Sequence, residues 1–178
     1  MPKFNSFASG LVGIVLMTGP VLADTGHSHK RSQAHDHGHA HEAAAIGRPG
    51  KSADVDRTIN VTMSDNEFSL IVFHVKKGET IRFRITNTGD NGHEFSIGTP
   101  TMHAGHREKM LKMLEDGTFD DDGLPTAKDH DDANTISLAP GKTGELIWTF
   151  TKSGDLEVAC NLPGHYESGM KAKLAIRL

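Results

Sequence analysis

Short runs of alternating apolar and polar residues recur between positions 57 and 178, and they strongly constrain how this chain can fold. In 79–87, for example, Ile81, Phe83 and Ile85 alternate with arginine and threonine. This period-two pattern predicts a strand with one buried face, because successive side chains point to opposite faces. Similar runs predict strands at 58–63, 68–75, 93–98, 135–138, 145–151, 155–160 and 171–178. About eight short strands separated by turns indicate an all-β fold, a β-sandwich.

The segment 101–132 interrupts this rhythm. Residues 105–115 have helical character, with four apolar residues between positions 110 and 114, and an Asp-Gly pair ends the run. From Glu115 to Asp132 the chain carries eight acidic residues and one lysine, which predicts a solvated loop. We therefore expect a short helix and an acidic loop inserted before the last strands.

The first 23 residues resemble a secretory signal peptide. They combine Lys3, an apolar run at 11–16, a Gly-Pro break and small residues ending at Ala23. We expect cleavage before Asp24 and export to the periplasm. The apolar run is too short to span a bilayer, which takes ~20 residues, and no later segment approaches that length. Stable membrane insertion is therefore not expected, and the alternative is that the N-terminal segment is retained as an anchor.

Residues 24–56 are rich in histidine and poor in large apolar residues, so we expect them to be disordered. The folded domain is then expected at 57–178. Flexible imidazoles in a His-rich tract can bind Cu(II), Zn(II) or Ni(II) weakly, and the alternative is a solubilising tail without that role. The histidines of this tail are His27, His29, His35, His37, His39 and His41.

Charge and cysteine content exclude two further classes of protein. The formal net charge is -4 at pH 7 and no basic stripe is visible, so nucleic acid is not an expected partner. The single cysteine, Cys160, excludes a disulfide within the chain. An unpaired thiol in an exported protein needs another explanation, and a bound metal provides one.

Three metal-binding side chains lie close together near the C-terminus. Cys160, His165 and Met170 supply a thiolate, an imidazole and a thioether on one short loop. Soft sulfur ligands select copper, and two histidines, one cysteine and a weak axial methionine form a type 1 copper site. Because Cys160 follows Leu156 and Val158 on the inward face of a predicted strand, its sulfur should point into the sandwich.

The missing imidazole is assigned to His93, at the start of a predicted strand after the turn at 87–90. The other histidine in a strand, His74, lies beside two lysines and is expected on the surface. Asn91, Glu94 and Asn161 neighbour the candidate ligands, so they are candidates for hydrogen bonds around the metal.

The ligand loop also carries a family resemblance. Cys160-x-x-Pro163-Gly164-His165 resembles the azurin loop, and the C-x₄-H-x₄-M spacing is similar to that of rusticyanin. The region 58–178 resembles the bacterial periplasmic cupredoxins of copper tolerance. Further matches are Met63-Ser64-Asp65, Phe68, Lys77-Gly78-Glu79-Thr80, Arg82-Phe83, Asn87-Thr88-Gly89, His93-Glu94-Phe95, 139–145 and Gly169-Met170.

This resemblance implies a Greek-key cupredoxin β-sandwich that binds one type 1 copper through His93, Cys160, His165 and Met170. The implied function is copper tolerance by sequestration or transfer, with copper ions and a periplasmic copper-transfer or redox protein as partners. The alternative is a soluble electron carrier for a respiratory partner, which would use the same ligands.

An enzyme is not expected. A copper oxidase or nitrite reductase needs an additional multi-histidine centre, and a cysteine nucleophile paired with histidine would need a third partner that is not evident. Structural zinc is disfavoured, because methionine is a poor zinc ligand.

A second copper site is a further hypothesis. Four residues would lie near one face of the predicted helix, namely Met102, His106, Met110 and Met113, and His103 is adjacent to them. This arrangement could create a thioether-rich Cu(I) site. Core packing is the favoured alternative, because methionines at this spacing usually form the buried side of an amphipathic helix.

Overall fold

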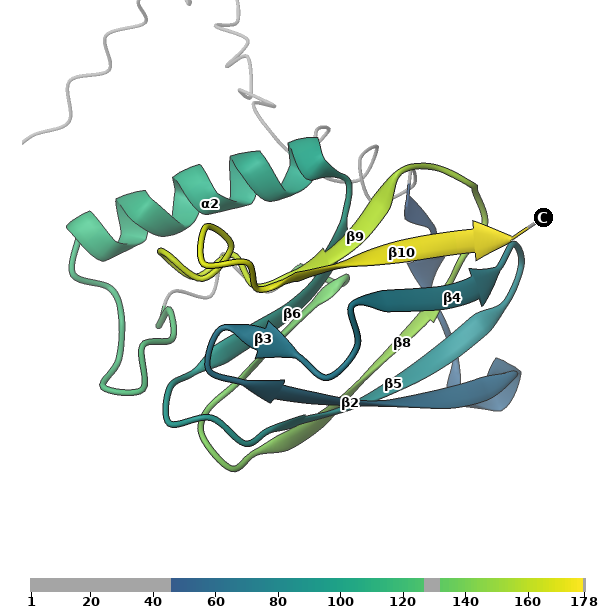
Figure 1. Cartoon of the computed structure of the whole chain (residues 1–178), viewed down its shortest axis with the longest axis horizontal. Helices are drawn as coiled ribbons and strands as arrows, with labels where there is room; N and C mark the ends of the chain where they lie inside the picture. Colours follow the sequence, from purple (N-terminus) through teal and green to yellow (C-terminus); the bar gives the residue numbers. More distant parts are fainter. Residues whose placement is uncertain (1–45, 127–131, 178) are drawn as a thin grey trace, which may run out of the picture. The chain divides into compact units, whose positions relative to one another are not determined.

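The fold is a sandwich of two sheets with one long helix against it (Figure 1). The computed structural model describes residues 46–126 and 132–177. The first sheet has the order β1 (Arg48–Pro49), β8 (Thr143–Thr149), β5 (Thr80–Asn87), β2 (Arg57–Ser64) and β3 (Glu67–Phe68). The second has the order β4 (Val72–Lys76), β10 (Lys171–Arg177), β9 (Leu156–Ala159), β6 (His93–Gly98) and β7 (Thr135–Leu138). The predicted all-β sandwich is confirmed.

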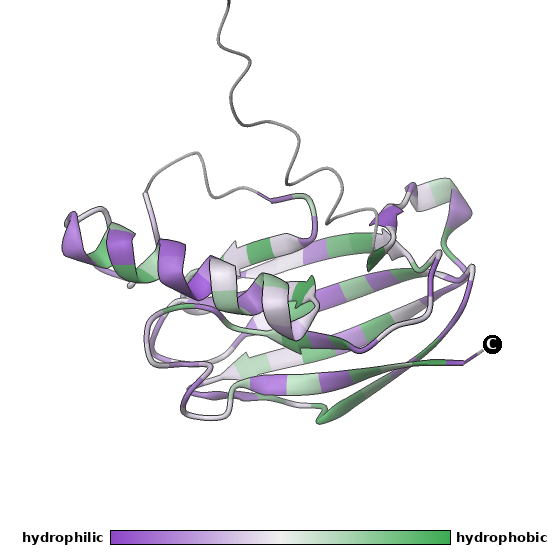
Figure 2. Ribbon diagram, turned by 90° about the horizontal axis from the view of Figure 1, so that it is seen from above, coloured by the Kyte–Doolittle hydropathy of each residue, from purple (hydrophilic) through white to green (hydrophobic). Residues whose placement is uncertain are grey.

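The inward faces of the two sheets form the core. On β5 the alternating Ile81, Phe83 and Ile85 are all 0% exposed, as the sequence pattern predicts. The Phe83 ring lies 5.1 Å from the Phe95 ring on β6, which joins the two sheets. Hydropathy alternates along several strands in Figure 2. This packing fixes β6, which begins at His93, against the rest of the sandwich.

The strand expected at 68–75 is wrong in one respect, because the chain changes sheet within it. Phe68 pairs with Met63 of β2 in the first sheet, whereas Val72 pairs with Lys173 of β10 in the second. The residues between form a crossing, where the Ser69 N–H donates to the Thr62 carbonyl. Apolar residues continue through the crossing, so the local pattern gives no sign of it.

The disorder expected up to residue 56 is wrong for residues 46–56. Strand β1 pairs with β8, and the short 3-10 helix η1 (Ser52–Asp54) follows it. Ile46 is 0% exposed, and the Trp148 indole N–H donates to its carbonyl at 3.1 Å. The folded part therefore begins before Arg57. The predicted signal peptide and the six tail histidines lie outside the described residues.

Helix α2 (Pro100–Glu115) confirms the predicted helix but begins five residues earlier than 105. The Thr99 hydroxyl accepts the Met102 N–H at 3.2 Å, and Pro100 occupies the first turn, two features that favour a helix start. Met110 and Met113 are buried in the core cluster. In the part of the chain that the structure describes, no helix has the length and apolar character needed to cross a membrane.

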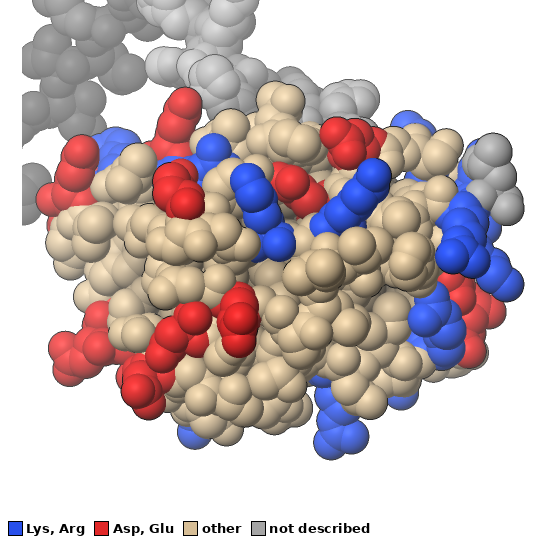
Figure 3. All heavy atoms as spheres, viewed as in Figure 1, with Lys and Arg blue, Asp and Glu red and all other residues tan. Residues whose placement is uncertain are grey.

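The chain after α2 lies against the loop that precedes His93. The Gly92 N–H donates to the Asp122 carbonyl at 2.7 Å, and a Cβ atom at Gly92 would lie 2.6 Å from that oxygen. The close approach therefore depends on glycine. In Figure 3 acidic side chains gather toward this end of the molecule, while basic and acidic side chains mix elsewhere on the same face.

Candidate metal centre

Cys160 directly follows β9 and points into the sandwich, as its alternation with Leu156 and Val158 predicts. The residue is 0% exposed, and its Sγ accepts the Glu94 N–H at 3.3 Å. Burial, with a smaller effect of the Glu94 charge, raises the pKa of the Cys160 thiol to about 12. Without a metal the thiol is therefore protonated at neutral pH.

His93 approaches Cys160 because β6 and β9 are neighbouring antiparallel strands, with Ser96 opposite Ala159. The His93 side chain is fully buried. Its Nδ1 lies 3.2 Å from Nδ1 of His165. The structure therefore brings His93, the histidine chosen from the sequence, to the cysteine loop, whereas His74 is exposed on β4.

His165 lies on a loop that curls back toward Cys160. The His165 N–H donates to the Leu162 carbonyl, and the Met170 N–H donates to the His165 carbonyl, both at 3.0 Å. Nδ1 of His165 lies 3.4 Å from the Cys160 sulfur. Burial, followed by the charge of His93, lowers the pKa of His165. Its imidazole is therefore neutral at pH 7, as a metal ligand must be.

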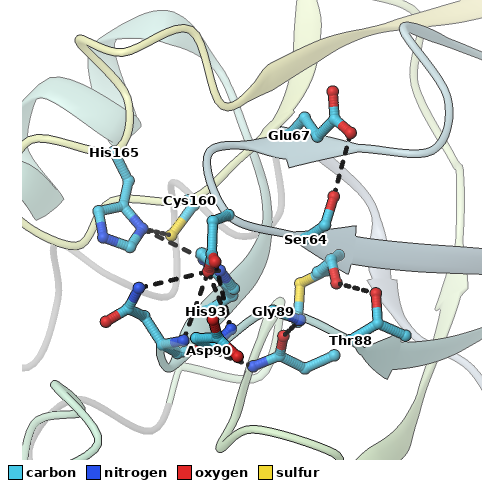
Figure 4. Close-up of polar contacts among 12 residues, drawn as sticks. Ser64, Glu67, Thr88, Gly89, Asp90, His93, Cys160 and His165 are labelled. Carbon is cyan, nitrogen blue, oxygen red and sulfur yellow. Dashed lines mark hydrogen bonds and ion pairs between the residues drawn. The ribbon is translucent and has the colours of Figure 1, made fainter.

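Three of the four predicted donors converge (Figure 4). The ligand atoms of His93, Cys160 and His165 all lie within 4.8 Å of one another, the one such histidine, cysteine or carboxylate group of three among residues 46–126 and 132–177. Met170 is fully buried on the same loop, and its carbonyl accepts the Cys160 N–H at 3.1 Å.

Asp65 also contacts this group, although the sequence analysis assigned it no role. Its Oδ1 lies 3.1 Å from Nε2 of His93. That hydrogen bond is the largest of several contributions that lower the pKa of Asp65 to about 2. The carboxylate is thus ionised at neutral pH and can only accept. Asp65 belongs to the quoted Met63-Ser64-Asp65 motif, but nothing local to the motif indicates the distant histidine.

The three polar residues expected around the ligands lie next to them. Glu94 is fully buried, and its Oε2 accepts from the backbone and side-chain amides of Asn161 at 3.0 and 2.9 Å. The Asn91 side chain donates to Asp65 at 3.3 Å. Hydrogen bonds of neighbouring polar residues therefore hold both Cys160 and His93 in position.

The helix residues considered for a second copper site have separate partners. Nδ1 of His103 faces the Asn161 side chain at 3.1 Å, whereas Nε2 of His106 lies 3.4 Å from Glu94. Met110 and Met113 belong to the core cluster, and Met102 packs against it. These contacts favour core packing over a second site on α2.

The donor atoms of His93, Cys160 and His165 fit copper. One thiol and two imidazoles are the main donor types of a type 1 copper site, and the thioether of a buried methionine such as Met170 is the type of its weak fourth donor. A closed zinc site would use more cysteine or histidine. The chemistry of the donor set thus agrees with the cofactor predicted from the sequence.

Comparisons with known proteins agree with this fold and donor set. A family described as a cupredoxin-like domain matches residues 39–120. The copper-resistant cuproprotein CopI of Pseudomonas aeruginosa is 38% identical over 150 residues, which cover 75% of this chain and 83% of the relative. The protein of the same name from Rubrivivax gelatinosus is 39% identical over 157 residues, which cover 87% of each chain.

Among solved structures, the auracyanin of the photosynthetic bacterium Roseiflexus castenholzii aligns with a TM-score of 0.55 at 22% identity. The alignment covers 70% of this chain and 99% of auracyanin, and it supports the fold. The predicted relationship to copper-tolerance cupredoxins is confirmed. With this sandwich and the identity to both relatives, the chain belongs to the CopI family of cupredoxin-like cuproproteins.

Proposed function

We propose that the protein binds one copper ion through His93, Cys160, His165 and Met170, and that it contributes to copper tolerance by sequestering or transferring the metal. The observation that carries this proposal is the convergence of a buried cysteine sulfur and two imidazole nitrogens within 4.8 Å. These donors come from separate parts of the sequence, and a type 1 copper site requires side chains of these types to meet.

Each ligand has a distinct part in this function. Bound copper would supply a one-electron redox couple. Cys160 would give up its proton and provide the strongest soft donor, while His93 and His165 would provide nitrogen lone pairs. Cys160, His93 and Met170 are each 0% exposed, so bulk water is kept from three of the four donors. His165 is half-buried and provides the route by which copper or an electron reaches the surface.

Copper tolerance, rather than copper binding alone, is supported by the names of the two relatives, both described as copper-resistant cuproproteins. A periplasmic location is supported by the signal-like sequence at 1–23. Copper that has passed the outer membrane would meet the protein there.

Electron transfer is the second candidate function. The half-buried His165 favours it, because an exposed ligand edge allows an electron to pass to a partner without release of the metal. Fast electron exchange with a respiratory partner, and unchanged copper sensitivity of a deletion strain, would favour the carrier over copper handling.

The first experiment tests the site. Copper stoichiometry and visible and paramagnetic spectra of the mature protein should show one copper with an intense thiolate charge-transfer band. Cys160→Ser should abolish the band. His74→Ala, which removes an exposed histidine outside the site, should leave it unchanged. A normal band in Cys160→Ser would falsify the assignment.

The second experiment tests the role in the cell. A strain that lacks the gene should grow poorly as copper increases, and the wild-type gene should restore growth whereas Cys160→Ser should not. Equal copper tolerance of all these strains would argue against a tolerance function, even if the purified protein binds copper.

A further inference from the structure

The contact between Asp65 and His93 joins a turn to the start of a strand that is distant in the sequence. Asp65 lies in the turn between β2 and β3, and His93 begins β6. The carboxylate also accepts the backbone N–H groups of Asp90 and Asn91, at 3.2 and 3.4 Å. Gly89 and Asp90, on the loop that leads to His93, are labelled in Figure 4. Asp65 is therefore held in place by the same segment that carries the ligand.

Gly89 leaves the space in which this contact forms. A Cβ atom at position 89 would lie 2.4 Å from Oδ1 of Asp65 and 3.0 Å from Nε2 of His93. Even a methyl group would therefore push the carboxylate and the imidazole apart. The contact depends on a glycine at this position as well as on the two partners.

The contact with Asp65 determines which ring nitrogen of His93 carries the proton and which has a lone pair for a metal. An ionised carboxylate only accepts hydrogen bonds, so the facing Nε2 must carry the proton. In the neutral ring Nδ1 then holds the lone pair, and Nδ1 is the atom that lies 3.2 Å from His165. A carboxylate behind a metal-binding imidazole fixes its tautomer and orientation and makes it a stronger donor.

We propose that Asp65 is a positioning residue of the copper site. It holds His93 with Nδ1 presented to the metal, and its negative charge favours Cu(II) over Cu(I), which lowers the reduction potential. The effect on copper rests on the proposed function, whereas the effect on the His93 tautomer is a property of the metal-free protein. The two effects can therefore be tested separately.

The tautomer is tested first, without copper. Long-range proton–nitrogen correlation spectra of the metal-free protein should show His93 protonated at Nε2. Asp65→Ala should give a mixture of tautomers, and Gly89→Ala should do the same although both partners remain. Asp90→Asn, which removes a neighbouring exposed charge that does not contact the ring, should retain the Nε2 tautomer. A His93 that stays fully protonated at Nε2 in Asp65→Ala would overturn the positioning role.

The potential is tested second, in the copper-loaded protein. Asp65→Asn should lower the ratio of the Cu(II) to the Cu(I) binding constant about tenfold, which raises the potential by about 59 mV for one electron. Asp65→Glu should restore most of the difference. Equal shifts in Asp65→Asn and Asp90→Asn would overturn the proposal, because a charge that does not contact the His93 ring would then have the same effect. If the wild type lacks the charge-transfer band, the proposed function fails, and the tautomer experiment still decides the role of Asp65.

Discussion

Cys160 is fully buried, and its proposed role as a copper ligand requires it to lose a proton. Its thiol pKa of about 12 means that the metal-free protein holds this proton at neutral pH, so copper must displace it. We therefore expect release of about one proton per Cu(II) at pH 7.5, and an apparent binding constant that rises tenfold per pH unit below the thiol pKa. The His165 imidazole should contribute little there, because its lowered pKa keeps it neutral.

Anaerobic calorimetry in two buffers with different ionisation enthalpies measures this proton release. Cys160→Ser should release no proton at the same pH. Absence of release in the wild type would mean that the thiolate already exists before copper binds.

Met170 should tune the site rather than hold the metal. The residue is 0% exposed, and leucine fills a similar volume, so Met170→Leu should cost less than about 1.5 kcal/mol of folding stability. We expect the visible band to remain and the potential to rise, because loss of the thioether donor destabilises Cu(II). Voltammetry measures the shift, and Met113→Leu on α2 is the matched control. Complete copper loss in Met170→Leu would show that the methionine is an essential ligand.

Strands were predictable from the sequence where their alternation was unbroken, as in β5 and β10. The crossing between β3 and β4 was not, because alternation shows which residues are buried but not which sheet buries them. The four candidate ligands could be chosen from the sequence because their chemistry fits one metal geometry, and the structure brings three of them together. The role of Asp65 could not be predicted, because its contact with His93 depends on how two segments that are distant in the sequence meet in the fold.

Helix α2 is joined to the ligand loop through one arginine. The Arg107 guanidinium lies 3.9 Å from the centre of the Tyr166 ring and 3.0 Å from the Glu167 carboxylate. Both partners directly follow His165 in sequence. Because a helix is stiffer than a loop, these contacts should limit movement of the histidine ligand.

Arg107→Ala should therefore destabilise the fold by about 1 kcal/mol, since partly exposed cation–π and ion-pair contacts are each worth about that much or less. It should also speed hydrogen exchange at the amides of Ser168, Gly169 and Met170. Lys112→Ala removes the exposed ion pair with Asp116 on the same helix and serves as the control. Equal exchange rates in both variants would contradict a role of Arg107 in the loop.

The molecule as a whole combines a sandwich that brings three candidate ligands together with a histidine-rich sequence that precedes residue 46. Ile46 and β1 complete the edge of the first sheet beside Trp148. The six histidines all precede residue 46. Two N-terminal deletions that end at different residues can therefore test separately whether the tail binds copper and whether residues 46–50 stabilise the sandwich.

Two deletions of the mature protein test these two roles. Deletion of 24–44 removes all six histidines, so copper stoichiometry should fall while the visible spectrum and the unfolding midpoint stay unchanged. Deletion of 24–50 also removes Ile46 and the acceptor of the Trp148 N–H. Loss of a buried side chain costs about 2–5 kcal/mol, and an unpaired buried donor about 1–3 kcal/mol. The longer deletion should therefore lower the unfolding midpoint as well.

Equilibrium dialysis against copper and urea unfolding provide the two measurements. A variant in which all six tail histidines are replaced by glutamine keeps the length of the tail and should match the shorter deletion in stoichiometry. If that variant binds as much copper as the wild type, the histidines do not collect the metal. If the two deletions unfold at the same urea concentration, the contacts of Ile46 and β1 do not stabilise the sandwich.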